Sequence, residues 1–273
     1  MIMNIQNTIT NKQEVWIGVD LGTTGVRAIA YDVEGQKYCS SEAFYPLLTP
    51  HPDWAEENPL QIFESVEKVI KETAAELRYK NCLLQGIALS TVMHSFAGLD
   101  EHYEPLMDMQ TWADSRSASI VKEMKQDEKL CRSFYEKTGC PIHACYPLAK
   151  VIWLRRNHPE IFQQMRYVGS LKDYIFRGLT GEWLIDHSTA STSGMYNEKN
   201  MDWDDEILAY AGLRREQMPS IVSTTYMSKL SSEAAAAMEL PEGVPVVIGA
   251  TDGVLVNVGI GAVHPGQLSA TIG

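Results

Sequence analysis

The stretch VWIGVDLGTTGVRAIAYD, Val15–Asp32, decides how the first part of this chain folds. Apolar residues alternate on both sides of a central turn, which is typical of two half-buried strands joined as a hairpin. Two interpretations of the tip stay open. Its glycines allow a tight turn with positive φ, and its backbone N–H groups and hydroxyls also suit a phosphate cradle. The tip residues in question are Asp20, Gly22, Thr23, Thr24, Gly25 and Arg27.

The composition bounds the kind of protein and its partners. The chain has 273 residues, of which 45% are hydrophobic, enough for one large domain or two smaller ones with a real core. The formal net charge is -12 and Lys and Arg form no run, which argues against a nucleic-acid partner. Any anionic ligand must therefore be held by local donors. The polar start MIMNIQNTITNKQE is unlike a signal peptide, and no stretch approaches a membrane span.

The cysteines indicate a reducing compartment. Their number is odd and they form no CxxC pair, so we expect reduced thiols in a cytoplasmic protein. A zinc site would want more ligands at tighter spacing. The five are Cys39, Cys82, Cys131, Cys140 and Cys145.

A β-β-β-α-β unit is predicted around the hairpin. The turn at Glu34-Gly35 leads into a third strand. Asn58 as N-cap and Pro59 at the first helical position begin an amphipathic helix over about 59–80. The apolar stretches GIALST and FAGLD then predict two short strands.

The middle of the chain, from about 115 to 240, is predicted to be mostly helical. The stretch PLAKVIWLRRNHPEIFQQM is amphipathic, with a break near Pro159. The stretch KDYIFRGLTG ends a helix at Gly178 or Gly181.

The last part returns to strands. VPVVIGATDGVLVNVGIGAV predicts a buried strand, a turn at 251–253 and a helix, and QLSATIG begins another strand. A chain that ended there would leave an unfinished turn and an unpaired edge. We therefore expect a truncated chain.

Two strand ends carry residues suited to chemistry. Met93 and His94 follow one apolar strand, and Asp252 follows another and begins a helix. Ligands collect at strand ends in α/β folds. A carboxylate at a helix N-terminus is stabilised as the anion, which suits a general base. The alternatives are that Asp252 is only an N-cap and that His94 is a satisfied core histidine.

The stretch TWADSRS also allows a functional and a structural interpretation. Trp112, Asp114 and Arg116 could shape a pocket, or they could be a helix start with a structural Asp–Arg pair.

Taken in order, these motifs resemble a known family. DLGTTGVR resembles the first phosphate-binding motif of the actin, hexokinase and heat-shock ATPase superfamily. The series DLGTT, MH, TWADSR, YPLAKVIWLRRN and TDG resembles the FGGY family of carbohydrate kinases, with Cys145 where the family signature usually has another residue. Longer stretches, including MHSFAGLDEHYEPLMDMQTWADSRS and DHSTASTSGMYN, are similar to the bacterial gluconate kinases of that family.

This resemblance covers about Val15 to Gly273 and implies a fold. We expect an α/β, ribonuclease H-like domain of the actin/hexokinase-like ATPase kind, with a mixed β-sheet, flanking helices and a helical insertion. Residues 1–14 would be a flexible N-terminal tail, and 15–273 the sugar-binding domain that carries the catalytic base. The C-terminal nucleotide domain would be absent from this chain.

The resemblance also implies ATP and Mg²⁺ as cofactors. Gly22, Thr23, Thr24, Gly25 and Arg27 would approach the ATP phosphates. Gly25 stands where a serine is common in relatives, so one hydroxyl is lost. Asp20 would orient the magnesium ion, through water.

The acceptor site follows from the same motifs. Asp252 matches the family's catalytic base, which takes the proton of the attacking sugar hydroxyl. Arg116 and Lys150 are candidates for a substrate carboxylate on charge alone. The full set of expected substrate-binding residues is Met93, His94, Trp112, Asp114, Arg116, Lys150 and Gly253.

The implied reaction converts gluconate and ATP to 6-phosphogluconate. A pentulose kinase, such as one for xylulose, is the alternative, because the Met-His pair serves there too. The Arg-Glu pair of glycerol kinases is missing. A non-catalytic sugar-binding relative would have lost Asp252. We expect a small sugar or sugar acid as the partner, and the chain could form a homodimer. We also expect this fragment to fold but not to catalyse phosphate transfer by itself.

Overall fold

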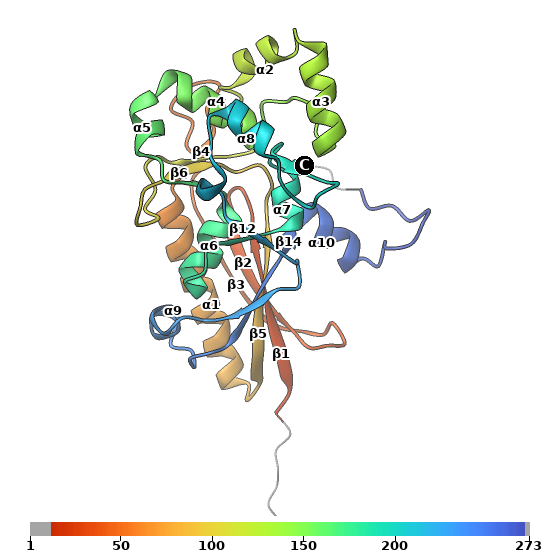
Figure 1. The fold of residues 1–273 in the computed structure, drawn as a ribbon. Coiled ribbons are helices and arrows are strands. Elements are labelled where there is room, and N and C mark those ends of the chain that lie inside the picture. The colour runs from red at the N-terminus through yellow and green to blue at the C-terminus, as the bar shows by residue number, and fades with distance from the viewer. Residues whose placement is uncertain (1–11, 271–273) are drawn as a thin grey trace, which may run out of the picture.

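The structure is a computed structural model that describes residues 12–270 (Figure 1). Of the expected tail, residues 1–11 lie outside the described part. The first strand, β1, already begins at Glu14. The last three residues of the expected final strand also lie outside it, and residues 267–270 form no strand.

A mixed six-stranded sheet is the centre of the fold, as predicted (Figure 1). The hairpin pairs β1 and β2 antiparallel, β3 extends it antiparallel, and β5 and β14 lie parallel to β1 on its other side. Side chains of β1 alternate between buried and more exposed, which explains why the quoted stretch forms a strand. The sheet order is β13(Met227–Lys229), β14(Pro245–Thr251), β5(Leu83–Thr91), β1(Glu14–Leu21), β2(Gly25–Tyr31), β3(Lys37–Phe44).

The predicted amphipathic helix covers β2 and β3. It is α1(Pro59–Tyr79), and the side chain of Asn58 caps it by accepting from the N–H of Gln61 at 3.0 Å. Its buried face joins the sheet in one hydrophobic core, to which α6(Leu171–Thr180) and α9(Ser232–Ala237) also contribute. Helix α6 ends at Gly181, the second of the two expected stops.

The helical insertion has a core of its own. A second cluster of buried apolar residues, between about 96 and 218, is distinct from the one against the sheet. It forms the upper part of the molecule in Figure 1. Its helices are α2(Ala118–Met124), α3(Glu128–Thr138), α4(Pro147–Asn157), α5(Pro159–Gln164), α7(His187–Ser191), α8(Asp205–Ala211) and the 3₁₀ turn η1(Arg215–Gln217).

Several short strands tie the insertion together, and the sequence analysis missed most of them. They pair two by two outside the main sheet. Such strands are too short to show a period of two in the sequence. They are β4(Glu56–Glu57), β6(Ala97–Leu99), β7(Met109–Gln110), β8(Tyr167–Gly169), β9(Leu184–Asp186), β10(Tyr196–Asn197), β11(Asp202–Trp203) and β12(Ser220–Val222).

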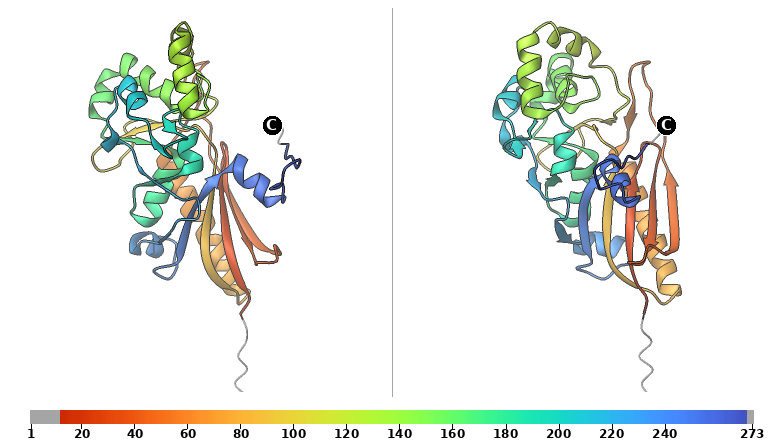
Figure 2. Two further views of the ribbon diagram at one scale, coloured as in Figure 1. Left: turned by 45° about the vertical axis from the view of Figure 1, so that its right-hand side comes forward. Right: turned by 90° about the vertical axis from the view of Figure 1, so that its right-hand side faces the viewer.

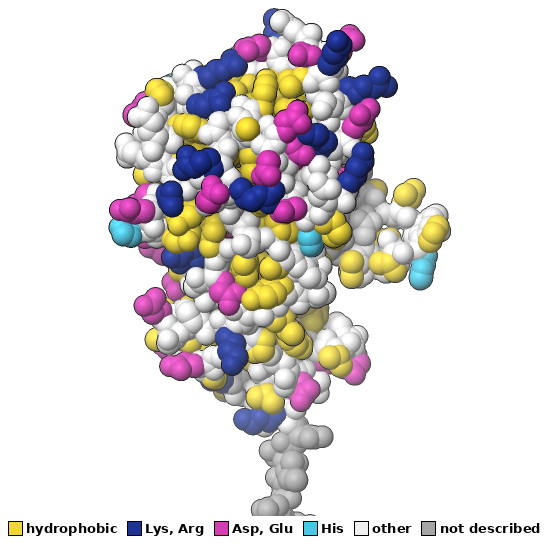
Figure 3. All heavy atoms as spheres, viewed as in Figure 1, with side chains coloured by type: hydrophobic (Ala, Val, Ile, Leu, Met, Phe, Trp, Pro, Cys, Tyr) yellow, Lys and Arg dark blue, Asp and Glu magenta, His cyan; other side chains and the backbone are white. Residues whose placement is uncertain are grey.

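Helix α10(Asp252–Gly259) leaves the end of β14 and projects from the body of the domain (Figure 2). None of its residues is buried. Among residues 12–270, no helix has the length and apolar character that crossing a bilayer would need. On the face seen in Figure 3, Lys and Arg are interspersed with Asp and Glu instead of forming a basic patch.

Candidate functional site

The hairpin tip is shaped by close packing and not by positive φ. Gly22 and Gly25 both lie outside the left-handed region, so the first of the two interpretations, a turn that needs positive φ, is wrong. A Cβ on Gly25 would lie 2.7 Å from the carbonyl oxygen of Ala43 in β3, so a side chain there would require the backbone to shift. The hydroxyl of Tyr45 donates to the carbonyl of Gly22 at 2.6 Å and fixes the tip from below.

A cavity of about 670 Å³ opens where the parallel strands β1, β5 and β14 end. Each strand runs directly into a segment that supplies part of the wall, as expected for the carboxyl edge of an α/β sheet. The cavity is lined by Thr23, Val92, Met93, His94, Trp112, Ala113, Asp114, Ser115, His143, Ala144, Cys145 and Asp252.

His94 lies in this wall with a strained backbone. Its φ is +67°, unusual for a residue other than glycine. Its Nδ1 lies 2.9 Å from the carbonyl oxygen of Thr192, and its ring meets Tyr146 edge to face at 4.9 Å. Burial lowers the pKa of His94, so the ring is neutral, with Nδ1 as donor and Nε2 as acceptor. His94 is therefore hydrogen-bonded within the fold and also lines the cavity.

Asp252 lies between this cavity and a second one. The second hollow, of about 510 Å³, is lined by Asp20, Ser90, Met93, Gly253 and residues of α10. Thr251 is the N-cap of α10, so Asp252 is the first helical residue and not the cap. Burial, with the Asp20 carboxylate adding to it, raises the pKa of Asp252. Asp20 itself accepts from the hydroxyl of Ser90 at 2.9 Å.

The tip residues line different hollows. Thr23 faces the cavity and accepts a hydrogen bond from the indole N–H of Trp112 at 2.9 Å. Trp112 remains 52% exposed. A smaller hollow is lined by Gly22, Thr24, Gly25 and Arg27, among others. Arg27 pairs there with Glu42 at 3.1 Å, and both side chains stay half exposed.

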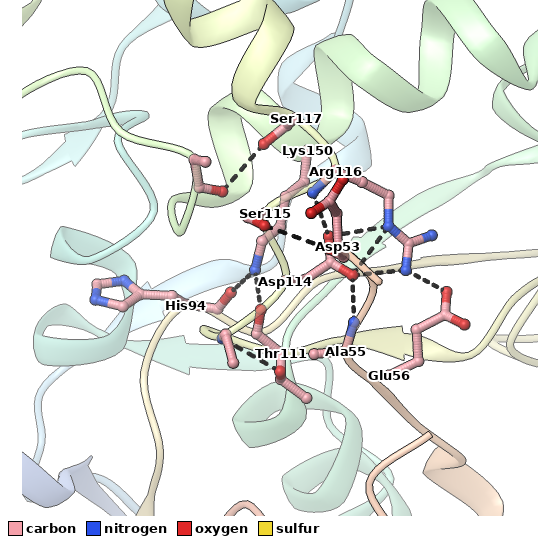
Figure 4. Close-up of polar contacts among 12 residues, drawn as sticks. Asp53, Ala55, Glu56, His94, Thr111, Asp114, Ser115, Arg116, Ser117 and Lys150 are labelled. Carbon is pink, nitrogen blue, oxygen red and sulfur yellow. Dashed lines mark hydrogen bonds and ion pairs between the residues drawn. The ribbon is translucent and has the colours of Figure 1, made fainter. Parts of the chain in front are cut away.

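Asp114 and Arg116 form a buried structural pair. Asp114 Oδ2 accepts from the backbone N–H of Ala55 at 2.8 Å and from Arg116 Nη2 at 2.6 Å. The same guanidinium donates to Glu56 at 2.7 Å and lies 3.5 Å from the ring centre of Trp54. Figure 4 shows the polar contacts of Asp114, Arg116, Ala55 and Glu56. The structural interpretation of the pair is therefore the one that the geometry favours.

Lys150 is also engaged within the fold. It is fully buried, and its Nζ donates to the backbone carbonyls of His94 and Thr111, each at 2.6 Å (Figure 4). Burial lowers the pKa of Lys150 to about 7. Neither Lys150 nor Arg116 lines the cavity. In this structure both side chains hold the wall from behind, and their contact with a substrate carboxylate stays a prediction from charge alone.

A second buried lysine was missed. Lys172 of α6 donates to the carbonyls of Ile248 and Ala250 at 2.7 and 3.1 Å, with Asp186 at 3.6 Å. Those carbonyls flank Gly249, where φ is +69° and the pairing of β14 with β5 shifts register. Lys172 thus holds the irregular end of β14 that presents the catalytic-base candidate. A lysine in a helical pattern gives no sequence signal for this role.

The loop at 143–145 was missed as well. It connects α3 with α4 and forms the wall that His143, Ala144 and Cys145 contribute. The backbone N–H of Cys145 donates to His143 Nδ1 at 3.2 Å. The histidine in TGCPIHACYP was the available signal, but loop geometry decides whether such a residue reaches a site.

The carboxylates fit a magnesium ion only in part. Among residues 12–270 no group of three His, Cys, Asp or Glu side chains could hold a metal. Asp20 and Asp252 line one hollow, and Mg²⁺ is usually bound by one or two carboxylates, with water and phosphate oxygens as its other ligands. The donor set therefore suits magnesium brought in with a nucleotide.

A mixed sheet whose hairpin tip and aspartates meet at one strand edge defines the actin/hexokinase-like ATPase fold, in which the solved relatives are sugar kinases. The model of the FGGY family of carbohydrate kinases, N-terminal domain, matches residues 15–259. The chain belongs to this family.

Individual relatives agree with that assignment. The chain is 36% identical over 258 residues to a gluconokinase of Bacillus subtilis (strain 168), covering 94% of this chain and 50% of the relative. It is 29% identical over 260 residues to a xylulose kinase of Escherichia coli (strain K12), covering 95% and 52%. The crystal structure of gluconate kinase from Lactobacillus acidophilus is similar with a TM-score of 0.86 and 32% identity, over 91% of this chain and 50% of that one. The chain thus spans about half the length of these relatives.

Proposed function

We propose that this chain is the sugar-binding half of a kinase that transfers the γ-phosphate of ATP to gluconate, giving 6-phosphogluconate. The observation that carries the proposal is the position of Asp252, which lines both the cavity beside Met93 and His94 and the hollow that contains Asp20. An acceptor hydroxyl in the first space would meet a phosphate in the second at this carboxylate.

Asp252 acts as the general base. Its oxygen takes the proton of the sugar hydroxyl while that hydroxyl oxygen forms a bond to the γ-phosphorus, and the bond from the γ-phosphorus to the β-bridging oxygen breaks to release ADP. Partial burial raises the pKa of Asp252, which makes the carboxylate a better proton acceptor. Bound magnesium would neutralise phosphate charge beside Asp20.

The hairpin tip contributes the phosphate side. Thr23 and Thr24 offer hydroxyl and backbone donors, and Arg27 offers a charge once it exchanges Glu42 for phosphate. The net charge of -12 opposes an anion overall, so these local donors have to supply the attraction.

Two candidate substrates fit this proposal. The gluconokinase of Bacillus subtilis is 36% identical to the chain, and the xylulose kinase of Escherichia coli is 29% identical. The higher identity favours a sugar acid. A pentulose such as xylulose is the second candidate, because the Met93-His94 pair lines the cavity in either case.

Because the chain spans half of its relatives, turnover is proposed for a protein with both halves. The chain by itself is expected to bind sugar and not to consume ATP, since the adenosine contacts and the closing of a cleft would come from the second half. A purified 273-residue chain with gluconate-dependent ATP turnover would contradict this.

Titration calorimetry of the chain with gluconate, xylulose and glycerol tests the substrate. We expect gluconate to bind most tightly. His94→Asn, in which asparagine tolerates the positive φ, should weaken that binding at least tenfold, and His102→Ala, an exposed histidine elsewhere, should not change it. Tighter binding of xylulose than of gluconate would replace the sugar acid by a pentulose.

The role of Asp252 needs a separate variant. Asp252→Asn should keep the affinity for gluconate within about threefold, because the amide preserves the shape of the cavity. In a chimera that joins this chain to the second half of the Bacillus subtilis gluconokinase, the same variant should lower phosphorylation by at least 1,000-fold, on the order expected for a catalytic base together with its charge. An active Asp252→Asn chimera would remove Asp252 from the mechanism.

A further inference from the structure

The cavity has two ends, which Met93 and His94 set apart. The Met93 side chain points toward the base, because its Cε lies 2.9 Å from where a Cβ on Gly253 would be. The His94 ring points the other way, toward Tyr146 and the loop that precedes α4. Asp252 lines the cavity on the side toward which Met93 points, and the loop of His143, Ala144 and Cys145 lines it on the side toward which His94 points. We call the second of these the far end of the cavity.

The far end has one imidazole whose protonated nitrogen is free. His143 Nδ1 accepts from the backbone N–H of Cys145 at 3.2 Å and lies 3.1 Å from the Cys145 Sγ. A nitrogen that accepts carries no proton in the neutral ring, so the proton is on Nε2. Nε2 has no hydrogen-bond partner among residues 12–270, and the side chain is exposed at the cavity.

The arginine, the lysine and the other histidine near the cavity are engaged elsewhere. Arg116 is paired with Asp114 and Glu56, and Lys150 holds two backbone carbonyls. His94 uses Nδ1 on the Thr192 carbonyl, which leaves its Nε2 as an acceptor. Of the residues that line the described cavity, His143 is thus the imidazole that can donate to an anionic group.

We infer that His143 binds the carboxylate of a sugar acid whose hydroxyl at the opposite end of the carbon chain lies at Asp252. This inference rests on the proposed function and names the group that selects an acid over a neutral sugar. An aldonic acid that reacts at its terminal hydroxyl has its carboxylate at the far end of the carbon chain, which matches the two ends of the cavity. Charge-assisted hydrogen bonds of this kind are about twice as strong as neutral ones.

A pair of ligands isolates the carboxylate. Gluconate and glucitol have the same carbon chain and differ at C1, where glucitol has a neutral alcohol. By calorimetry we expect His143→Ala to weaken gluconate at least tenfold and to leave glucitol within about twofold. His143→Gln, which keeps an N–H donor, should recover part of the loss. His102→Ala, an exposed histidine away from the cavity, is the matched control and should alter neither ligand.

The outcomes separate this inference from the proposed function. Gluconate binding that His143→Ala leaves unchanged, or an equal loss for gluconate and glucitol, would overturn the role of His143 while the sugar-acid site stands. A wild-type chain that binds xylulose but not gluconate would overturn the sugar-acid function itself, and a chain that binds none of these ligands would contradict both. Because His143 is exposed, unchanged thermal melting of the variants would show that folding is not the cause.

Discussion

The ammonium group of Lys150 donates to the backbone carbonyl of His94 at 2.6 Å, and it does so from a fully buried position. The residue held in this way is the one with φ of +67° in the wall of the cavity. A strained backbone persists only where its surroundings hold it in place. The lysine is therefore a positioning residue for the acceptor site.

Replacing this lysine should change how stability depends on pH. Burial lowers the pKa of Lys150 from 10.5 to about 7. Between these two values the unfolded chain binds more protons at this position than the folded one, so the free energy of unfolding rises with pH. Relative to Lys150→Met, the wild type should gain on the order of 2 kcal/mol between pH 7 and 9.

Urea unfolding of both proteins at several pH values measures this difference. Lys172 adds the same pH dependence to the unfolding free energy of both proteins, so its contribution cancels in the difference between them. Lys68→Met, at an exposed lysine, should unfold with the same pH dependence as the wild type. A pH-independent gap between wild type and Lys150→Met would mean that Lys150 stays charged in the fold.

The buried guanidinium of Arg116 should contribute to stability and not to ligand charge. Arg116→Met leaves the carboxylates of Asp114 and Glu56 without their cation and should cost about 3–5 kcal/mol. Arg27→Met removes an exposed pair with Glu42 and should cost less than about 1 kcal/mol. Chemical denaturation compares the two. An Arg116→Met chain of normal stability that no longer binds gluconate would restore the direct role expected from the sequence.

Gly249 should tolerate no side chain. Its φ is +69°, and a Cβ would lie 1.8 Å from the carbonyl oxygen of Leu89 in the neighbouring strand. Gly249→Ala is therefore expected to cost on the order of 4 kcal/mol or more. Gly35 has φ of +83° with open space around it, so Gly35→Ala carries the conformational cost alone, about 1 kcal/mol. Equal melting temperatures for the two variants would show that β14 can shift away from β5.

The bond between Trp112 and Thr23 should couple the sugar cavity to the hairpin tip. In a double-mutant cycle of Trp112→Phe and Thr23→Val, we expect an interaction free energy of about 0.5–1.5 kcal/mol. The control cycle uses Thr24→Val, because Thr24 lines a different hollow from Thr23 and Trp112. Its interaction with Trp112 should be near zero. Coupling of the same size in both cycles would point to a general loosening of the tip.

Part of this structure was predictable because its causes are local. Alternating burial in β1, the Asn58 cap with Pro59 at the start of α1, and the stop of α6 at Gly181 each depend on residues within one element. The family followed from motifs in order along the chain, and the matching family model confirmed it. The assignments of individual site residues to ATP, magnesium and sugar stay predictions.

Other features depended on partners far away in the sequence. Arg116 and Lys150 carry positive charge that could pair with a sugar acid. In the fold, however, they bind Glu56, Asp114 and backbone carbonyls, one of which lies 56 positions from Lys150 in the sequence. No local pattern encodes which carbonyl a buried ammonium group will meet.

The sequence by itself determined the mixed sheet, the family and the acidic residue at the end of β14, because alternation, capping and motif order act over short distances along the chain. Only the tertiary structure decided that Gly25 packs closely against the Ala43 carbonyl, that two lysines hold the walls of the site, and that His143 lines its far end. A buried charge has to find partners wherever packing brings them, and packing is a property of the whole chain.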